Sequence, residues 1–401
     1  MQHTLHKINL DFSDSSVAFK GINDQDLVKA FWLFRLMANP ALSKLNNRLV
    51  PGLVKSFFPV RWVVKKTAFK HFCGGETIEE CEQTITSLKA RLVHTILDYS
   101  VEGEKDEATF EETTEEVLKT IEKAAKDSSV PFAVFKMSGL INPTILTKRQ
   151  NQDSLSLEES KNFEAFIARL DRVFTKASSG QVRVFVDAEE SWFQKEIDSL
   201  TLELMAKYNH SFPIVWNTYQ LYLMHNRDLF ARHLEFAKAK GFVLGAKLVR
   251  GAYMEKESAY AASVGLPTPV NSSKQATDDL YNEVATLALN NIDKVHFCLG
   301  THNEDSCRLI ANQMAGNNID FSDERVWFAQ LLGMSDNLSN TLAEKGFNVA
   351  KYVPYGPVKA VIPYLVRRAQ ENTSVAGQTS RELNLINAEL KRRGVSKAKF
   401  F

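Results

Sequence analysis

The chain has 401 residues, of which 44% are hydrophobic and 24% are charged, the balance of an ordinary globular protein with a large core. Its 18 glycines and 11 prolines exclude the collagen-like and the Pro/Gly-rich disordered classes. The 49 Lys and Arg residues against 48 Asp and Glu residues leave a net charge of +1, so no global basic charge points to nucleic acid as a partner.

Cysteine usage and the chain start predict the compartment. Cys73, Cys81, Cys298 and Cys307 form no C-x-x-C pair and lie in no His-rich cluster, which argues against a structural zinc site and a disulfide framework. No apolar run approaches the roughly 20 residues that span a bilayer. The N-terminus lacks the apolar core of a signal peptide and carries acidic residues that a transit peptide avoids. We therefore expect a cytoplasmic protein in a reducing environment.

The first part of the chain has helical patterns. One helix is predicted to begin at Asn23 or Asp24 and to end before Pro40. Residues 59–75 place apolar and basic side chains on different faces of a second helix. A basic amphipathic helix can rest on a membrane, so residues 49–72 are candidates for peripheral contact at the inner face of the cell membrane. Packing against the main domain is the favoured alternative.

From about residue 90 onward, short apolar runs alternate with longer charged amphipathic stretches. This rhythm predicts a parallel sheet covered by helices. Ser156 with Glu159 forms a capping box for one of these helices, and Gly241 is a natural helix end. The apolar runs are residues 92–99, 131–139, 182–189, 212–219, 242–251, 295–303, 325–332 and 349–356.

Two features favour an eight-stranded (β/α)8 TIM-like barrel over an open doubly wound sheet. No G-x-G spacing occurs, so the dinucleotide fingerprint and the Walker A loop are absent. Polar residues also stand at the carboxyl ends of the runs, which converge on one mouth in a barrel. These residues are Glu102, Lys136, Asp187, Asn217, Lys247, His302, Gln330 and Tyr352. We predict an N-terminal helical segment over residues 1–90, the barrel over 91–385 and a tail over 386–401.

The last helical pattern, YLVRRAQENTSV, carries a candidate anion site. Tyr364, Arg367, Arg368 and Glu371 fall at i, i+3, i+4 and i+7, the spacing of one helix face. Two adjacent guanidinium groups beside an aromatic ring suit a small carboxylate. The alternative is an exposed ion-pair face in which Glu371 bonds one of the arginines.

A second cluster lies in KLVRGAYMEKE (residues 247–257). Lys247 and Arg250 flank an apolar pair, and Gly251 with Ala252 opens a turn into a helix. Small residues and cations at a strand-to-helix junction suit an anion such as a cofactor phosphate. An ordinary turn is the alternative.

No metal site is expected. Glu102, Asp187 and His302 could be proposed as ligands, but they come from separate runs without H-x-x-H or H-x-E spacing.

Taken in order, these motifs resemble the proline dehydrogenase family, flavoenzymes of proline catabolism. The resemblance spans roughly residues 90–380. It implies a barrel that holds FAD without a covalent link, oxidises L-proline to Δ1-pyrroline-5-carboxylate and passes electrons to a quinone. KLVRGAY and YLVRRAQENTS are highly specific, whereas NTYQLYL and QLLGM look like the single-function form of the family. The other motifs are VFKMSG, FVDAEE, THN and YVPYG.

The resemblance also implies roles for single residues. A strand lysine and paired arginines hold the carboxylate of proline in the family, and these match Lys136, Arg367 and Arg368. Other substrate-side positions match Asp187, Tyr253, Tyr352, Tyr364, a leucine that is Leu331 or Leu332, and Glu102 as a gate that pairs with the first arginine; Glu371 shares their helix face. Flavin contacts match Asn217, Gln220, Lys247, Arg250, Gly251, Ala252, Lys274 and His302. Lys247 stands where fused members often have arginine, and Asn217 stands where the family has glutamine.

Three alternatives stay open at this point. One is a 4-hydroxyproline dehydrogenase of the same superfamily. Another is a non-catalytic barrel that binds an amino acid or a phosphate. The third is a Schiff-base lyase that uses Lys136 or Lys247. The resemblance places Tyr352 beside the substrate ring carbon that bears the hydroxyl in 4-hydroxyproline. A bulky ring there leaves little room for that hydroxyl, so we expect a preference for proline.

Overall fold

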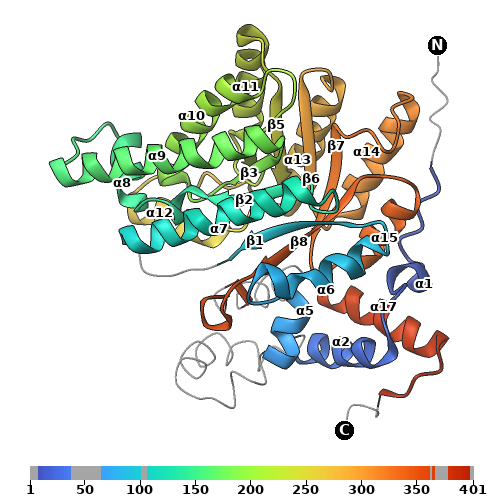
Figure 1. Cartoon of the computed structure of the whole chain (residues 1–401). Helices are drawn as coiled ribbons and strands as arrows, with labels where there is room; N and C mark the ends of the chain where they lie inside the picture. The colour runs from blue at the N-terminus through green and yellow to red at the C-terminus, as the bar shows by residue number, and fades with distance from the viewer. Residues whose placement is uncertain (1–7, 38–64, 101–105, 362–363, 366–377, 398–401) are drawn as a thin grey trace, which may run out of the picture. The chain divides into compact units, whose positions relative to one another are not determined.

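The computed structural model describes residues 8–37, 65–100, 106–361, 364–365 and 378–397 (Figure 1). Eight strands follow one another in order around a closed barrel, and the described pairings, β8 with β1 and each neighbour pair from β2 to β7, are parallel. The barrel confirms the predicted fold class, and each strand lies within or beside a predicted run. The strands are β1 His94–Tyr99, β2 Phe132–Lys136, β3 Arg183–Asp187, β4 Val215–Gln220, β5 Leu244–Val249, β6 Val295–Gly300, β7 Val326–Leu331 and β8 Val349–Tyr355.

The chain forms two compact units. The first unit comprises Met1–Ile8 and Glu104–Ala329, and the second comprises Asn9–Gly103 and Gln330–Phe401. Helices of the first unit are α7 Glu107–Lys126, η2 Met137–Gly139, α8 Pro143–Gln150, α9 Leu157–Gly180, α10 Ser191–Tyr208, α11 Asn226–Lys240, α12 Met254–Ser263, α13 Lys274–Asn290 and α14 Glu304–Gly316. Described helices of the second unit are α1 Ser15–Ala18, α2 Asp24–Met37, η1 Lys65–Phe69, α5 Lys70–Phe72, α6 Ile78–Lys89, α15 Asp336–Glu344 and α17 Gln378–Arg392.

An aromatic core fixes the strand register of the first unit. The rings of Phe132 and Phe185 stack with centroids 4.3 Å apart, and Trp216 meets Phe185 edge-on at 5.6 Å. Side chains alternate between the two faces of a strand. Residues an even number of positions beyond these rings therefore share their face of the sheet. Lys136, Asp187, Thr218 and Gln220 stand in that relation, whereas Asn217 does not.

Capping groups set the helix boundaries of the first unit. The predicted capping box is present, because Ser156 and Glu159 each bond the other's backbone amide at the start of α9. Ser273 accepts from Ala276 N at 3.1 Å and begins α13, and Asn303 accepts from Ser306 N at 2.9 Å and begins α14. Gly241 ends α11 with a φ of 76°, a conformation that glycine adopts without strain.

The second unit packs its helices around an apolar cluster. α2 packs against α17, and α1 packs against α15 and α17. The predicted start of α2 is confirmed, because Asn23 Oδ1 accepts from Asp26 N at 2.9 Å. Part of the predicted helix over residues 59–75 is a π-helical turn, η1, followed by α5, which ends before Cys73; residues 59–64 lie outside the described residues. The cluster includes Leu27, Phe31, Phe34, Phe72, Val358, Val361, Tyr364 and Ile386.

The described residues include all four cysteines and the helices named above. All four cysteines are free and buried, and burial raises the pKa of the Cys81 thiol to about 12. No described helix combines the length and the apolar character that crossing a bilayer requires. No group of three His, Cys, Asp or Glu side chains suited to a metal ion occurs among these residues either.

Candidate active site

Three predicted residues meet at the carboxyl ends of β2, β3 and β5. Lys136 and Asp187 are the last residues of neighbouring strands and are paired in register. Lys247 Nζ forms an ion pair with Asp187 Oδ1, and its side chain is only 5% exposed. The same ammonium lies 5.1 Å from the centroid of the Phe185 ring. A buried lysine is tolerated because a carboxylate and an aromatic face compensate for lost water.

A second polar cluster lies around Arg250, directly after β5. Its guanidinium donates to Asp278 Oδ1 at 2.6 Å, Thr301 Oγ1 at 2.6 Å and Ser306 Oγ at 3.0 Å. It also lies 4.4 Å from the ring centroid of Tyr281. These contacts fix the guanidinium in one orientation between the ends of β5 and β6. His302, another predicted residue, follows Thr301 directly in the chain.

Asp278 joins two of the predicted cofactor residues. Its second oxygen accepts from Lys274 Nζ at 2.5 Å, while its first accepts from Arg250. Burial alone would raise the pKa of Asp278, but the hydrogen bonds from Lys274 and Arg250 outweigh it and hold that pKa below its usual range. One carboxylate shared by two cations leaves the cluster with net positive charge. The i, i+4 spacing of Lys274 and Asp278 on one helix was a sequence signal for this pair.

The turn at Gly251 could not accommodate another residue. Its φ is +119°, and a Cβ placed there would lie 1.8 Å from the Tyr222 ring. Gln220 Oε1 would lie 3.2 Å from the same Cβ. Gly251 and Ala252 are exposed on the other side of the turn. The backbone is therefore open to a ligand at the place where the sequence predicted a phosphate.

The structure separates the two predicted flavin contacts of β4. Asn217 is fully buried, and its amide donates to Asp198 Oδ1 of α10 at 2.8 Å. Burial raises the pKa of that carboxyl group to about 6. The side-chain amide of Asn217 therefore bonds to helix α10, which packs against β4. Gln220 instead donates to Glu189 O at 2.7 Å and stands beside Gly251.

Glu189 is a site-adjacent residue that the sequence reasoning missed. It is buried two positions after Asp187, and its Oε1 accepts from Ser138 N at 2.9 Å. Burial raises its pKa, and the Ser138 contacts and the charge of Lys136 offset that rise in part. The bond between Ser138 and Glu189 connects the segment after β2 to the segment after β3. The sequence signal that could have identified Glu189 is the pair of acidic residues at the end of FVDAEE.

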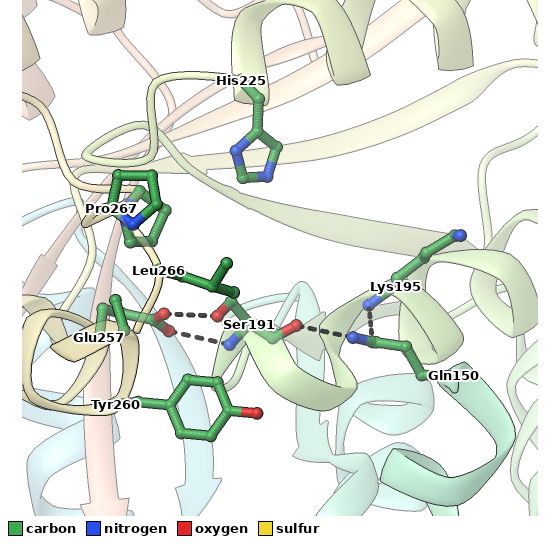
Figure 2. A pocket seen from close by; sticks show the side chains of 10 residues that line it. Gln150, Ser191, Lys195, His225, Glu257, Tyr260, Leu266 and Pro267 are labelled. Carbon is green, nitrogen blue, oxygen red and sulfur yellow. Dashed lines mark hydrogen bonds between the residues drawn. The ribbon is translucent and has the colours of Figure 1, made fainter. Parts of the chain in front are cut away.

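A separate cleft of about 320 Å³ lies beside α8, α10 and α12 (Figure 2). Figure 2 shows Ser191 between two partners. Its N and Oγ donate to Glu257 at 2.8 and 2.5 Å, and its carbonyl accepts from Gln150 at 3.1 Å. None of the predicted site residues that the structure describes lines this cleft. Its central polar groups bond each other and join three helices, so we assign it no part in the site.

The second unit also holds described substrate-side candidates. Tyr352 and Tyr364 are both buried. Tyr352 O accepts from Leu332 N at 2.9 Å, and Leu331 packs against the apolar cluster that contains Tyr364. The structure thus groups Leu331 with Tyr364. Of the other substrate-side candidates, Glu102, Arg367, Arg368 and Glu371 lie outside the described residues.

Comparison with known proteins gives consistent matches. The sequence model described as proline dehydrogenase matches residues 81–381. The mitochondrial proline dehydrogenase 1 of Dictyostelium discoideum is 34% identical over 379 residues, covering 84% of this chain and 66% of that protein. The hydroxyproline dehydrogenase of Xenopus laevis is 30% identical over 423 residues, covering 96% of this chain and 90% of that protein.

Among solved structures, proline utilization A from Bdellovibrio bacteriovorus, inactivated by N-propargylglycine, superposes with a TM-score of 0.75 at 20% identity. The alignment covers 98% of this chain and 44% of that one, and at this identity it shows a shared fold. The chain therefore spans just under two thirds of the Dictyostelium relative and less than half of the solved chain. With the family pattern matching most of its length, this chain belongs to the proline dehydrogenase family.

Proposed function

We propose that this chain is an FAD-dependent proline dehydrogenase. It would oxidise L-proline to Δ1-pyrroline-5-carboxylate, the first step of proline degradation to glutamate, and deliver the electrons to a quinone. The observation that carries the proposal is the pair of polar clusters at the strand ends of the first unit. Asp187 with Lys247 forms one, and Arg250 with Asp278 and Lys274 forms the other.

The described residues fit a flavin dinucleotide. A glycine turn with uncovered backbone and a net positive cluster suit a diphosphate. The Tyr222 hydroxyl under that turn is buried without a hydrogen-bond partner among the described residues. When bound, FAD supplies the hydride acceptor. Residues proposed to hold it are Gln220, Lys247, Arg250, Gly251, Ala252, Lys274 and His302. For Asn217 we propose a structural role instead, in which its bond to Asp198 attaches β4 to α10.

The proposed substrate residues bind and orient a ring carboxylate. Lys136, Arg367 and Arg368 would clamp the carboxylate and fix the carbon that loses hydride. An apolar wall of Tyr352, Tyr364 and Leu331 would pack against the ring, with Tyr253 as a polar neighbour, Glu102 as the gate and Glu371 supporting the arginines. Because the structure packs Leu331 with the cluster of Tyr364, we prefer it to Leu332 for this wall.

The charges of Lys247 and Asp187 at the strand ends suit the proposed oxidation of proline. The ammonium of Lys247 would stabilise negative charge that develops near it, and Asp187 keeps this ammonium in place. The proline amine has to lose its proton before hydride can leave. Asp187 already accepts from Lys247, so we propose that solvent takes this proton.

A 4-hydroxyproline dehydrogenase is the second candidate, and the Xenopus relative carries that name. Tyr352 argues for proline, because a buried phenol ring at this position leaves little space for a substrate hydroxyl. We place the enzyme in the cytoplasm. For residues 49–72 we keep packing within the protein as the favoured alternative to a peripheral membrane contact, because Phe69 and Phe72 belong to the apolar cluster of the second unit.

Acid precipitation of the purified protein tests the cofactor proposal. We expect a yellow protein that releases its flavin into the supernatant. Colour that stays with the pellet would contradict non-covalent binding, and a colourless protein that does not take up FAD would favour the non-catalytic barrel. Trapping of a carbonyl substrate by borohydride on Lys136 or Lys247 would favour the lyase.

A further inference from the structure

A charged side chain that the proposed chemistry does not use lies buried in the second unit. Lys351 belongs to β8, directly before Tyr352, and its side chain is 1% exposed. Its Nζ lies 2.7 Å from Asp336 Oδ1. The same ammonium donates to Met334 O at 2.5 Å and to Leu331 O at 3.3 Å. Burying an ammonium is costly unless such partners surround it.

All three partners of Lys351 belong to one segment, residues 331–336, which we call the β7 turn. Two of its residues have a positive φ, +76° at Gly333 and +51° at Ser335. Such a backbone is strained for serine. One long backbone bond, from Met334 N to Leu331 O at 3.3 Å, lies within the turn, and contacts from outside the turn add to it.

Other elements of the second unit hold the same turn. His71 Nε2 bonds Gly333 O at 2.9 Å, and burial lowers the pKa of His71, so the neutral ring donates this bond. A Cβ at Gly333 would lie 2.5 Å from His71 O. On the far side, Ser335 N donates to Glu382 Oε1 of α17 at 2.7 Å.

Neighbouring charges act on both members of the pair formed by Lys351 and Asp336. Arg91 lies 3.6 Å from the second oxygen of Asp336. Burial would raise the pKa of Asp336, but Lys351 and Arg91 outweigh it and hold that pKa below its ordinary value. Burial lowers the pKa of Lys351, and the charges of Asp336 and Glu382 oppose that lowering. The carboxylate stays ionised and keeps its attraction for the ammonium.

The β7 turn carries residues of the proposed apolar wall. Leu331, whose carbonyl Lys351 binds, packs against the cluster of Tyr364. Leu332 N donates to Tyr352 O at 2.9 Å. Lys351 thus touches the backbone on one side of this wall and is the chain neighbour of Tyr352 on the other.

We propose that Lys351 is a positioning residue for substrate specificity. Its ammonium, paired with Asp336, holds the β7 turn in the one conformation that sets Leu331 against the substrate ring beside Tyr352. This inference rests on the proposed function, because it assigns the wall to a proline ring.

Lys351→Met tests the inference, since methionine retains most of the side-chain length and loses the charge. The matched control is Arg393→Met. Arg393 is also a cation of the second unit that binds two backbone carbonyls, Phe19 O at 2.9 Å and Ile22 O at 2.6 Å. It also binds two carboxylates, those of Glu389 and Asp24. It touches no residue of the β7 turn in these contacts.

Two readouts are required. Hydrogen–deuterium exchange should speed up at the amides of residues 331–336 in Lys351→Met and stay unchanged there in Arg393→Met. The KM for proline should rise about tenfold in Lys351→Met, with a smaller change in kcat and with flavin content retained. The control should lose stability while keeping its KM. Unchanged exchange in the turn, or an unchanged KM, overturns the proposal.

Asp336→Asn covers the case in which Lys351→Met does not fold. It removes one charge at constant volume, and we expect faster exchange at the β7 turn and a rise in KM of a few fold; if both stay at wild-type values, the proposal is overturned. Failure of the wild-type protein to oxidise proline is a separate result. It would contradict the proposed function and the specificity role together, whereas the exchange data would still report whether Lys351 holds the turn.

Discussion

Asp187 and Lys247 show how single side chains define the candidate site. Each was predicted from a strand end, and the structure joins them in an ion pair across β3 and β5. Asn217 differs, because its strand position turns its amide to Asp198 of α10. A match to a family motif identifies which residue to examine. Which face of the sheet its side chain occupies depends on the two-residue alternation along the strand.

Arg368 tests the carboxylate clamp. Arg368→Met should raise the apparent KM for proline by an order of magnitude or more while FAD remains bound, because losing a charge-assisted contact costs roughly 1.5–3 kcal/mol. Steady-state kinetics with a flavin absorbance check measure this. Glu102→Ala is the milder companion variant, since Glu102 is proposed to act through Arg367. A wild-type KM in Arg368→Met would show that this helix face is structural.

Tyr352 tests the choice between proline and hydroxyproline. Tyr352→Ser should open space beside the ring, weaken proline as a substrate and narrow its advantage over trans-4-hydroxyproline. The ratio of kcat/KM for the two substrates, in wild type and variant, is the measurement. If Tyr352 only packs the barrel rim, the variant will lose stability with an unchanged ratio.

At the scale of elements, the turn between β5 and α12 requires glycine at position 251. Gly251→Ala would place a methyl group against the Tyr222 ring in a backbone conformation that alanine avoids. We expect the purified variant to lose most of its flavin and its affinity for added FAD to fall about tenfold or more, with an unchanged far-UV spectrum.

Gly265→Ala is the control for this prediction. Gly265 also has a positive φ, +70°, but a Cβ there meets nothing within 4 Å. It should keep its flavin and lose only about 1 kcal/mol of stability. Equal flavin content in the two variants would show that the Gly251 turn does not bind the cofactor.

Glu382 links α17 to the β7 turn and should make stability depend on pH. Burial raises its pKa from 4.5 to about 7, so the folded state binds this proton more tightly than the unfolded state does. Between these pH values stability falls as pH rises. Glu382→Gln removes the titration, so the unfolding free energy of the variant relative to wild type should increase by about 2–3 kcal/mol from pH 4.5 to pH 8. Urea titrations across this range measure it, and a difference independent of pH would refute the assignment.

For the whole molecule, the sequence predicted the barrel because its strands are apolar, β-branched runs of the right length and number. Contacts between residues far apart in the sequence, near the proposed site, were harder to predict. Glu189 meets Ser138 from 51 positions away, and Lys351 meets a turn 15 to 20 positions earlier in the chain. Such pairs depend on which strand lies beside which, and no local spacing encodes that. The Lys274 and Asp278 pair was accessible because helix spacing alone brings those residues together.

The central claim is that this chain is an FAD-dependent enzyme that takes hydride from L-proline. Its most direct test is the visible spectrum of the purified holoprotein, recorded anaerobically before and after addition of L-proline. The account predicts loss of the flavin absorbance together with formation of Δ1-pyrroline-5-carboxylate, and a much slower loss with trans-4-hydroxyproline. A flavin spectrum that L-proline leaves unchanged would contradict it.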